Sequence, residues 1–171
     1  MIEYIKGKII NISCDKLIIE CSGIGYIVNT TSFFEKDKDE IIYIYTKKTE
    51  FEEELYGFKN KESKELFIYF LSIKGIGCKL AMNILKNDYH EIINALNNKD
   101  VDYFLSIPKI GATMANLITK NYKGNINVNN ELVLVLKELG YKKQDIYKIV
   151  HKIDKSKKID DQIKDAILLL E

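Results

Sequence analysis

The chain contains two short turns of the same design, and no other feature restricts its fold and function as much. Each turn ends in a glycine that a helical pattern follows, and these glycines, Gly77 and Gly111, lie 34 positions apart. Glycine has no side chain to hold a ligand away and can adopt positive φ, so free N–H groups at the next helix start can point at an anion. Such a turn makes no base-specific contacts. The pair of turns therefore predicts a protein that binds the nucleic-acid backbone, one turn per strand, independently of the base sequence.

The two turns differ in detail. The residues predicted to bind phosphate are Lys74, Gly75, Ile76, Gly77, Cys78 and Lys79 in the first turn, and Lys109, Ile110, Gly111, Ala112 and Thr113 in the second. Lys109 stands where the first turn has Gly75, and Thr113 where it has Lys79. A lysine attracts phosphate, but its Cβ narrows the approach to the backbone. We therefore expect the second turn either to bind phosphate more weakly or to be structural only.

The overall charge is nearly balanced, with 26 Lys and Arg against 25 Asp and Glu. Long-range steering toward DNA is therefore almost absent, and any basic footprint must be local. No apolar run approaches the ~20 residues that span a bilayer, and no basic segment followed by an apolar one opens the chain. We expect a cytoplasmic protein without a membrane partner.

The sequence shows no pattern of metal ligands. Cys14, Cys21 and Cys78 lack CxxC or Cys/His spacing, and His90 and His151 stand alone in polar helical contexts. We expect reduced, packed thiols, surface histidines and no cofactor.

Residues 1–60 carry β-strand signals. Strands rich in β-branched and aromatic residues are predicted at 4–12, 16–21, 26–31, 40–46 and 54–58, with a break at 22–25. Five short strands predict a small closed barrel of the OB-like kind, in which Gly7 and Gly25 would suit bulges.

From residue 61 the apolar period becomes helical. A stripe that includes Leu66 and Phe70 leads into the first turn, and Asp100 favours a helix start before the second. Residues 122–130, with four Asn, predict a linker, and residues 131–171 show three amphipathic stripes. The predicted fold is multidomain α+β: a barrel over 1–60, an all-α unit over 61–121, a linker over 122–130 and a three-helix bundle over 131–171.

Acidic residues gather just before residue 55, and Glu50 and Glu52 are the candidates for function among them. One interpretation is that they are solvent-exposed acids at a hairpin tip without a specific role. The other is that they lie beside DNA, where their carboxylates repel phosphate and so exclude a strand from that position. A metal-binding role in a nuclease fits poorly, because the acids are sequential in one turn.

In the order and size of its parts the chain resembles the RuvA family, the Holliday-junction-binding subunits of bacterial branch-migration complexes. The resemblance covers essentially the whole chain and identifies residues 61–121 as a tandem helix-hairpin-helix domain. It is carried by local matches at 1–2 and 7–9, 23–26, 55–58, 75–81 and 139–141.

The resemblance implies a homotetramer with four-fold symmetry that binds four-way junction DNA without catalytic chemistry of its own. Several weak backbone contacts in one assembly give avidity without a basic chain. The family's acidic pin at the strand crossover maps onto Glu50 and Phe51, so only the first acid is in register, and Glu52 is the candidate substitute.

The resemblance also implies partners. The third domain of the family contacts the hexameric RuvB ATPase, and the residues predicted for this contact are Leu139, Gly140, Tyr141, Ile146, Ile149 and Val150. This sequence has no GxxxxGK(S/T) motif, in keeping with a motor on another chain. A RuvC resolvase, or an equivalent, is a further expected partner.

Two other interpretations remain open. A helix-hairpin-helix glycosylase or nuclease would need a catalytic Asp or Lys beyond the hairpin, and none stands out. A general repair protein that binds duplex or single-stranded DNA would use the turns, or aromatic strand positions such as Tyr43 and Tyr45.

Overall fold

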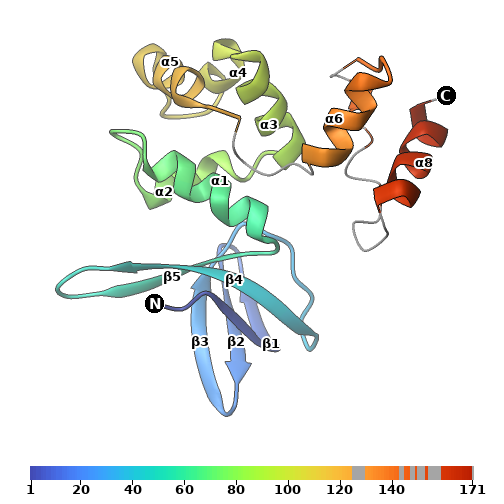
Figure 1. The fold of residues 1–171 in the computed structure, drawn as a ribbon. Helices are drawn as coiled ribbons and strands as arrows, with labels where there is room; N and C mark the ends of the chain where they lie inside the picture. The colour runs from blue at the N-terminus through green and yellow to red at the C-terminus, as the bar shows by residue number, and fades with distance from the viewer. Residues whose placement is uncertain (125–129, 143–144, 147–148, 150–152, 154–158, 171) are drawn as a thin grey trace.

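The structure is a computed structural model that describes residues 1–124, 130–142, 145–146, 149, 153 and 159–170. The strands come first: β1 (Tyr4–Ser13), β2 (Lys16–Cys21), β3 (Ile24–Asn29), β4 (Asp39–Lys48) and β5 (Glu53–Phe58). The helices are α1 (Lys61–Leu71), α2 (Cys78–Ile84), α3 (Tyr89–Asn98), α4 (Val101–Leu105), α5 (Ala112–Asn121), α6 (Asn130–Glu138) and α8 (Ile159–Leu170). Figure 1 shows α1 lying directly over the strands.

The five strands form a closed barrel in the order β1-β2-β3-β5-β4. Neighbouring strands are antiparallel except β3 and β5, which run parallel. Apolar residues that alternate along the strands fill the interior, and Ile9, Ile19, Val28 and Ile42 are fully buried there. Closure satisfies the strand edges, so the predicted OB-like barrel is confirmed.

The turn between β2 and β3 is shorter than the sequence predicts. Only Ser22 and Gly23 form it, both with positive φ (54° and 81°), as a two-residue hairpin turn requires. Cys21 pairs directly with Ile24, so β3 begins two residues earlier than expected.

The bulge in the barrel also lies elsewhere than predicted. The register between β1 and β2 shifts between Ile9 and Asn11, not at Gly7 or Gly25. Gly7 has a different role: a Cβ there would overlap the backbone carbonyl of Glu20 on the neighbouring strand.

The barrel and the helices share an apolar core at Phe67 of α1. The centroid of its ring lies 5.3 Å from that of Tyr45, 5.4 Å from that of Tyr56 and 4.9 Å from that of Phe58. These rings belong to β4 and β5, so α1 packs directly on the barrel wall. The first two predicted units are therefore one packed body.

The C-terminal helices α6 and α8 pack on each other around Leu132, Leu136 and Ala166. Gly140, with φ of 92°, ends α6, and the N–H of Tyr141 donates to the carbonyl of Leu136 at 3.2 Å. Of the predicted middle helix, 145–146 and 149 are helical, and most of the remainder lies outside the described residues.

The predicted fold class is confirmed: a barrel, a tandem helical unit and C-terminal helices follow one another along the chain. In the described part of the chain, no helix combines the length and the apolar character needed to cross a membrane.

Candidate nucleic-acid interface

The two predicted turns have the same backbone geometry. Gly77 precedes α2 with φ −95° and ψ 174°, and Gly111 precedes α5 with φ −93° and ψ 172°. The carbonyl of each glycine accepts a hydrogen bond of 2.9 Å from the N–H four residues later, that of Ala81 or Ala115. Both helix starts predicted from the glycine pattern are therefore confirmed.

Buried isoleucines fix both turns. The N–H of Ile76 donates to the carbonyl of Ile73 at 3.0 Å, and that of Ile110 to the carbonyl of Ile107 at 3.2 Å. All four side chains are buried. The surface of each turn is therefore formed mostly by backbone and by exposed residues such as Lys74.

The duplication extends into the helices that enter the turns. Residues 69–73 and 103–107 have the identical sequence YFLSI, again 34 positions apart. Ser72 and Ser106 each donate from Oγ to the carbonyl of the tyrosine three residues earlier, both at 2.6 Å. This repeated pentapeptide is a sequence signal that the glycine pattern alone missed, and it shows that the duplicated unit is a helix, a turn and the next helix start.

The helices that follow the glycine turns have open N-termini. The starts of α1, α3 and α4 are capped, because Asn60, Asp88 and Asp100 accept hydrogen bonds of 2.8–3.2 Å from first-turn N–H groups. In contrast, α2 and α5 have neither a side-chain cap nor an acidic residue in the first turn. A Cβ added at either glycine would meet nothing within 4 Å. Each N-terminus thus offers uncapped N–H groups, with partial positive charge, to an anion.

Lys109 adopts the conformation that its glycine counterpart has in the first turn. The φ of Gly75 is 95° and that of Lys109 is 72°. A Cβ at Gly75 would lie 3.2 Å from Cε of Met114, so the first turn also packs against the second hairpin. The second turn keeps its shape without its first glycine, although lysine rarely adopts positive φ.

A groove of about 710 Å³ connects both turns to the barrel. Its lysines come from three places: Lys16 from the barrel, Lys79 and Lys86 from α2 and its end, and Lys109 from the second turn. Two acids, Asp15 and Glu54, also line it. The groove is the local basic footprint that the balanced overall charge requires.

Sequence reasoning missed two of these lysines. Lys86 lies seven residues after Lys79, but α2 ends at Ile84, so the turn that follows the helix brings Lys86 to the groove. No spacing brings Lys16 near Lys109, because only the packing of the barrel against the helices does so.

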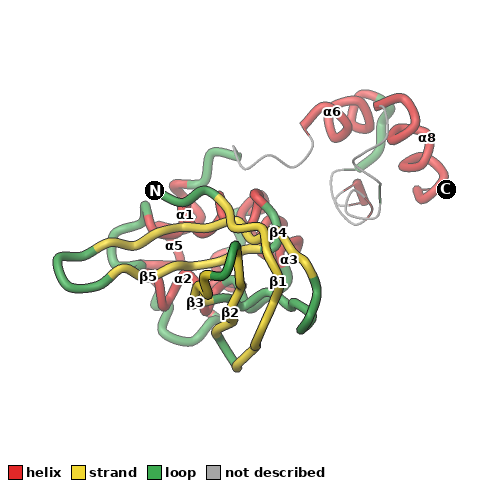
Figure 2. Tube along the Cα trace, turned by 90° about the horizontal axis from the view of Figure 1, so that it is seen from below, coloured by secondary structure: helices red, strands yellow, loops and turns green. Residues whose placement is uncertain are grey.

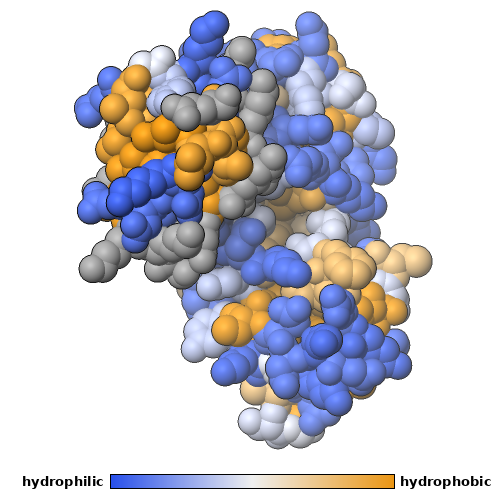
Figure 3. Space-filling view, turned by 90° about the vertical axis from the view of Figure 1, so that its right-hand side faces the viewer, coloured by the Kyte–Doolittle hydropathy of each residue, from blue (hydrophilic) through white to orange (hydrophobic). Residues whose placement is uncertain are grey.

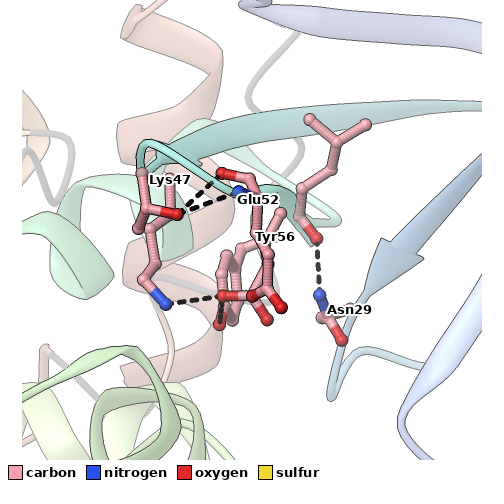
Figure 4. Close-up of polar contacts among 7 residues, drawn as sticks. Asn29, Lys47, Glu52 and Tyr56 are labelled. Atoms are coloured by element: carbon pink, nitrogen blue, oxygen red, sulfur yellow. Dashed lines mark hydrogen bonds and ion pairs between the residues drawn. The ribbon is translucent and has the colours of Figure 1, made fainter.

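Glu50 and Glu52 lie at the tip of a hairpin in which β4 and β5 continue beyond the barrel (Figures 1 and 2). The N–H of Thr49 donates to the carbonyl of Glu52 at 2.8 Å, and the N–H of Glu52 donates to Oγ1 of Thr49 at 3.0 Å. The Thr49 hydroxyl donates to the same carbonyl at 3.1 Å. Both carboxylates are exposed, and Figure 4 shows the polar contacts of Glu52 that close the turn.

The stem of this hairpin lies against the first glycine turn. Nζ of Lys47 is 2.6 Å from Oε2 of Glu54, which also accepts from the hydroxyl of Tyr56 at 3.2 Å (Figure 4). The hydrogen bond from Lys47 lowers the pKa of the Glu54 carboxyl, and the charge of Lys79 at the start of α2 acts in the same direction. Burial raises the pKa of the Cys78 thiol, which Lys47 opposes. The hairpin stem and the first phosphate candidate site are thus direct neighbours.

Among the residues that the structure describes, no three His, Cys, Asp or Glu side chains gather as metal ligands do.

Comparison with known proteins assigns the chain to a family. Residues 1–57 match the family model "RuvA N terminal domain", and residues 67–121 match "SAM-like Helix-hairpin-helix tandem". The Holliday junction branch migration complex subunit RuvA of Pediococcus pentosaceus is 33% identical over 192 residues, which cover 99% of this chain and 98% of that protein. The chain belongs to the RuvA family. RuvA proteins of Macrococcus caseolyticus (32% identical over 188 residues, 98% of this chain and 97% of that protein) and Acholeplasma laidlawii (30% over 187 residues, 99% of both) are similar as well.

In this RuvA family member, the residues predicted to contact a partner divide into two groups. Leu139 and Gly140 are exposed at the end of α6, and Tyr141 is half-buried. Ile146 and Ile149 are buried in the C-terminal core, and their contact with a partner stays a prediction. Val150 lies outside the described residues.

Apolar side chains also gather on the outer face of the C-terminal helices of this RuvA chain (Figure 3). The exposed ones are Leu139, Leu168 and Leu169. Single exposed apolar residues are common, but three on one small helical unit are a candidate contact surface.

Proposed function

We propose that this chain is the DNA-binding subunit of a Holliday junction branch migration complex, acting in the cytoplasm in recombination and repair. The observation that carries the proposal is the pair of uncapped helix N-termini with the same backbone geometry, joined to the barrel by a groove with four lysines. Phosphates bind at such N-termini and beside such lysines without base recognition. The names of the relatives agree with this proposal.

The proposed phosphate contacts are the backbone N–H groups of residues 77–79 and 111–113, with the ammonium groups of Lys74, Lys79 and Lys109 beside them. Ile76 and Ile110 contribute by anchoring, because their side chains are buried. Glu50 and Glu52 would act as the acidic pin, since their exposed carboxylates repel phosphate from the tip of the hairpin.

We further propose a homotetramer. Four copies supply eight glycine turns, and linked weak contacts give the avidity that a net charge of +1 cannot. The outer face of the barrel offers apolar surface for assembly: Ile18 and Ile27 are directly opposite each other there, and Ile27 is 61% exposed.

No catalytic role is proposed for the chain itself. A RuvB-type ATPase would supply the motor and would dock on the C-terminal unit, where Leu139, Leu168 and Leu169 are exposed. A RuvC-type resolvase is the further proposed partner. We propose that the functional parts of the chain are the barrel (1–60), the helix-hairpin-helix unit (61–121), the linker (122–130) and the C-terminal helical unit (131–171). The first two parts pack together.

Competition binding tests this function. A four-way junction should displace a labelled junction from the chain at a much lower concentration than linear duplex or single-stranded DNA of the same sequence. If duplex competes as well as the junction, the chain is instead a general helix-hairpin-helix repair protein. If single-stranded DNA competes better, the chain is a single-strand-binding protein in which aromatic side chains of the barrel stack on bases. The mass of the free protein, and of its junction complex, checks the tetramer.

Deletion of residues 130–171 tests the proposed motor contact. Because the barrel and the turns pack without this segment, the shortened chain should bind junctions like the full chain and fail to stimulate the ATPase. Loss of junction binding would contradict this division of labour.

A further inference from the structure

Phe51 stands at the apex of the β4–β5 hairpin with 92% of its side chain exposed. Five of the other six phenylalanines, Phe34, Phe58, Phe67, Phe70 and Phe104, are buried. The hydrogen bonds between Thr49 and Glu52 close the turn on both sides of Phe51, so the ring is presented on a fixed support. An aromatic ring held this way is available to a binding partner.

The hairpin that carries the ring reaches the groove through its stem. Glu54, in the hairpin stem, lines the groove together with Lys79 of the first turn. Phe51 is three residues from Glu54 along the chain, in the turn of the same hairpin. Nucleic acid held by its phosphates in the groove would therefore lie beside the hairpin that carries the ring.

The charges around the ring select its partner. Glu50, Glu52 and Glu53 flank Phe51 in the sequence and are all exposed. These carboxylates repel phosphate, so the ring does not meet nucleic-acid backbone, and they repel the identical tip of a second copy. A nucleobase is uncharged and offers a π-face, and an aromatic side chain stacks on it whatever the sequence.

We propose that Phe51 stacks on a nucleobase at the branch point of a four-way junction, where the last base pair of an arm has a face that its own arm does not cover. The inference rests on the proposed function and deepens it. The tip would then act in two ways: its acids exclude phosphate, and its ring holds a base.

The absence of tryptophan from the sequence makes a direct test possible. Phe51→Trp creates a single indole whose emission is quenched when it stacks on a base. Phe33→Trp is the matched control, because Phe33 is also exposed (77%) and does not line the groove. We expect junction DNA to quench the F51W variant strongly, linear duplex of the same arms to quench it little, and the F33W variant to respond to neither.

Affinity measurements separate stacking from simple apolar contact. Phe51→Ala and Phe51→Leu should both lower junction affinity by about 5- to 150-fold, which corresponds to ~1–3 kcal/mol per stacked base, and leave duplex affinity unchanged. Leucine keeps apolar volume but has no π-face, so full affinity of the F51L variant would overturn the proposal. A smaller assembly mass of the F51A variant would also overturn it, because the ring would then contact a second copy.

The two proposals fail in different ways. If the unaltered chain binds junctions no better than duplex, the proposed function is wrong. If it prefers junctions but the F51W emission does not change when they bind, only the stacking role of Phe51 is wrong.

Discussion

Tyr69 and Tyr103 occupy equivalent places in the two hairpins, yet only the hydroxyl group of Tyr69 has a hydrogen-bond partner among the described residues. The Tyr69 hydroxyl donates to the backbone carbonyl of Ile118. The Tyr103 hydroxyl is buried and, among the described residues, has no hydrogen-bond partner. The duplicated sequence therefore places one satisfied and one unsatisfied polar group in the same core.

Removing each hydroxyl should change stability in opposite directions. Tyr69→Phe loses a hydrogen bond and leaves a carbonyl without its donor, which should cost about 1–2 kcal/mol. Tyr103→Phe removes a buried group whose desolvation no hydrogen bond offsets, and should stabilise the chain by up to ~1 kcal/mol. Urea unfolding of the two variants checks both signs. A loss of stability in Y103F would mean that its hydroxyl is satisfied in solution.

Four tyrosines that are buried wholly or in part also make the chain sensitive to alkaline pH. Burial raises the pKa of Tyr103 from 10.0 to about 12, and it raises the pKa of Tyr56, Tyr69 and Tyr89 as well. A raised pKa in the folded state favours the neutral phenol, so this stabilisation is complete below pH 10, where unfolded tyrosine is neutral too. It is lost as the pH rises from 10 through 12. Unfolding followed by tyrosinate absorbance should show a cooperative alkaline transition, whereas gradual titration of all tyrosines near pH 10 would argue against it.

Lys109→Gly should make the chain more stable and its DNA binding weaker. Glycine adopts positive φ without strain, which should add about 1 kcal/mol to the free energy of unfolding. The loss of one ammonium per subunit from the groove should lower junction affinity. It should also reduce the slope of log affinity against log salt by about 1 for each phosphate that the chain no longer neutralises. Affinity titrations over a range of salt concentrations measure this.

Lys99→Gly is the matched control for that substitution. Lys99 ends α3 with φ of 53° and does not line the groove, so K99G should gain similar stability and keep its DNA affinity. Tighter junction binding by K109G would show instead that the Cβ of Lys109 obstructs the backbone.

Gly77→Asp should abolish junction binding while the fold is kept. The φ and ψ of Gly77 suit any residue, its Cβ would meet no atom, and aspartate is a favoured N-cap, so stability should stay within a few tenths of a kcal/mol. The new carboxylate would occupy the proposed phosphate position and repel DNA. A gel-shift assay measures junction affinity, with Gly77→Ala as the uncharged control. Wild-type affinity of the G77D variant would show that the N-terminus of α2 does not bind phosphate.

Replacing Glu50 and Glu52 by Gln should leave junction binding unchanged or tighter and alter branch migration. Both side chains are exposed, so the fold should not change. Removing the repulsion lets strands re-pair beside the tip. Branch-migration rates measured with the ATPase partner test this prediction. Unchanged rates would show that the two carboxylates have no role in migration.

Local chemistry made much of the fold predictable. The glycine turns, the capped start at Asp100 and the alternating strands of the barrel all depend on a few neighbouring residues, and the structure has each of them. The error at Gly25 arose where pairing between strands overrules local preference. Gly25 looks like part of a break, yet pairing with Glu20 holds it in β3.

The candidate site was only partly predictable for the same reason. Spacing locates Gly77 and Gly111, but Lys16 joins them through a packing contact that no pattern encodes. The stripe that contains Ile146 indicates an apolar helix face, and it does not say whether that face meets the core or a partner.

The aromatic packing at Phe67 has a mechanical consequence. Because rings from β4 and β5 close around one side chain of α1, the strands that lead to the acidic hairpin and the helix that leads to the first glycine turn are packed together. If this packing is kept when DNA binds, the DNA is the part that deforms. Work done by a motor on the arms would be converted into strand separation at a spacing that the protein sets in advance.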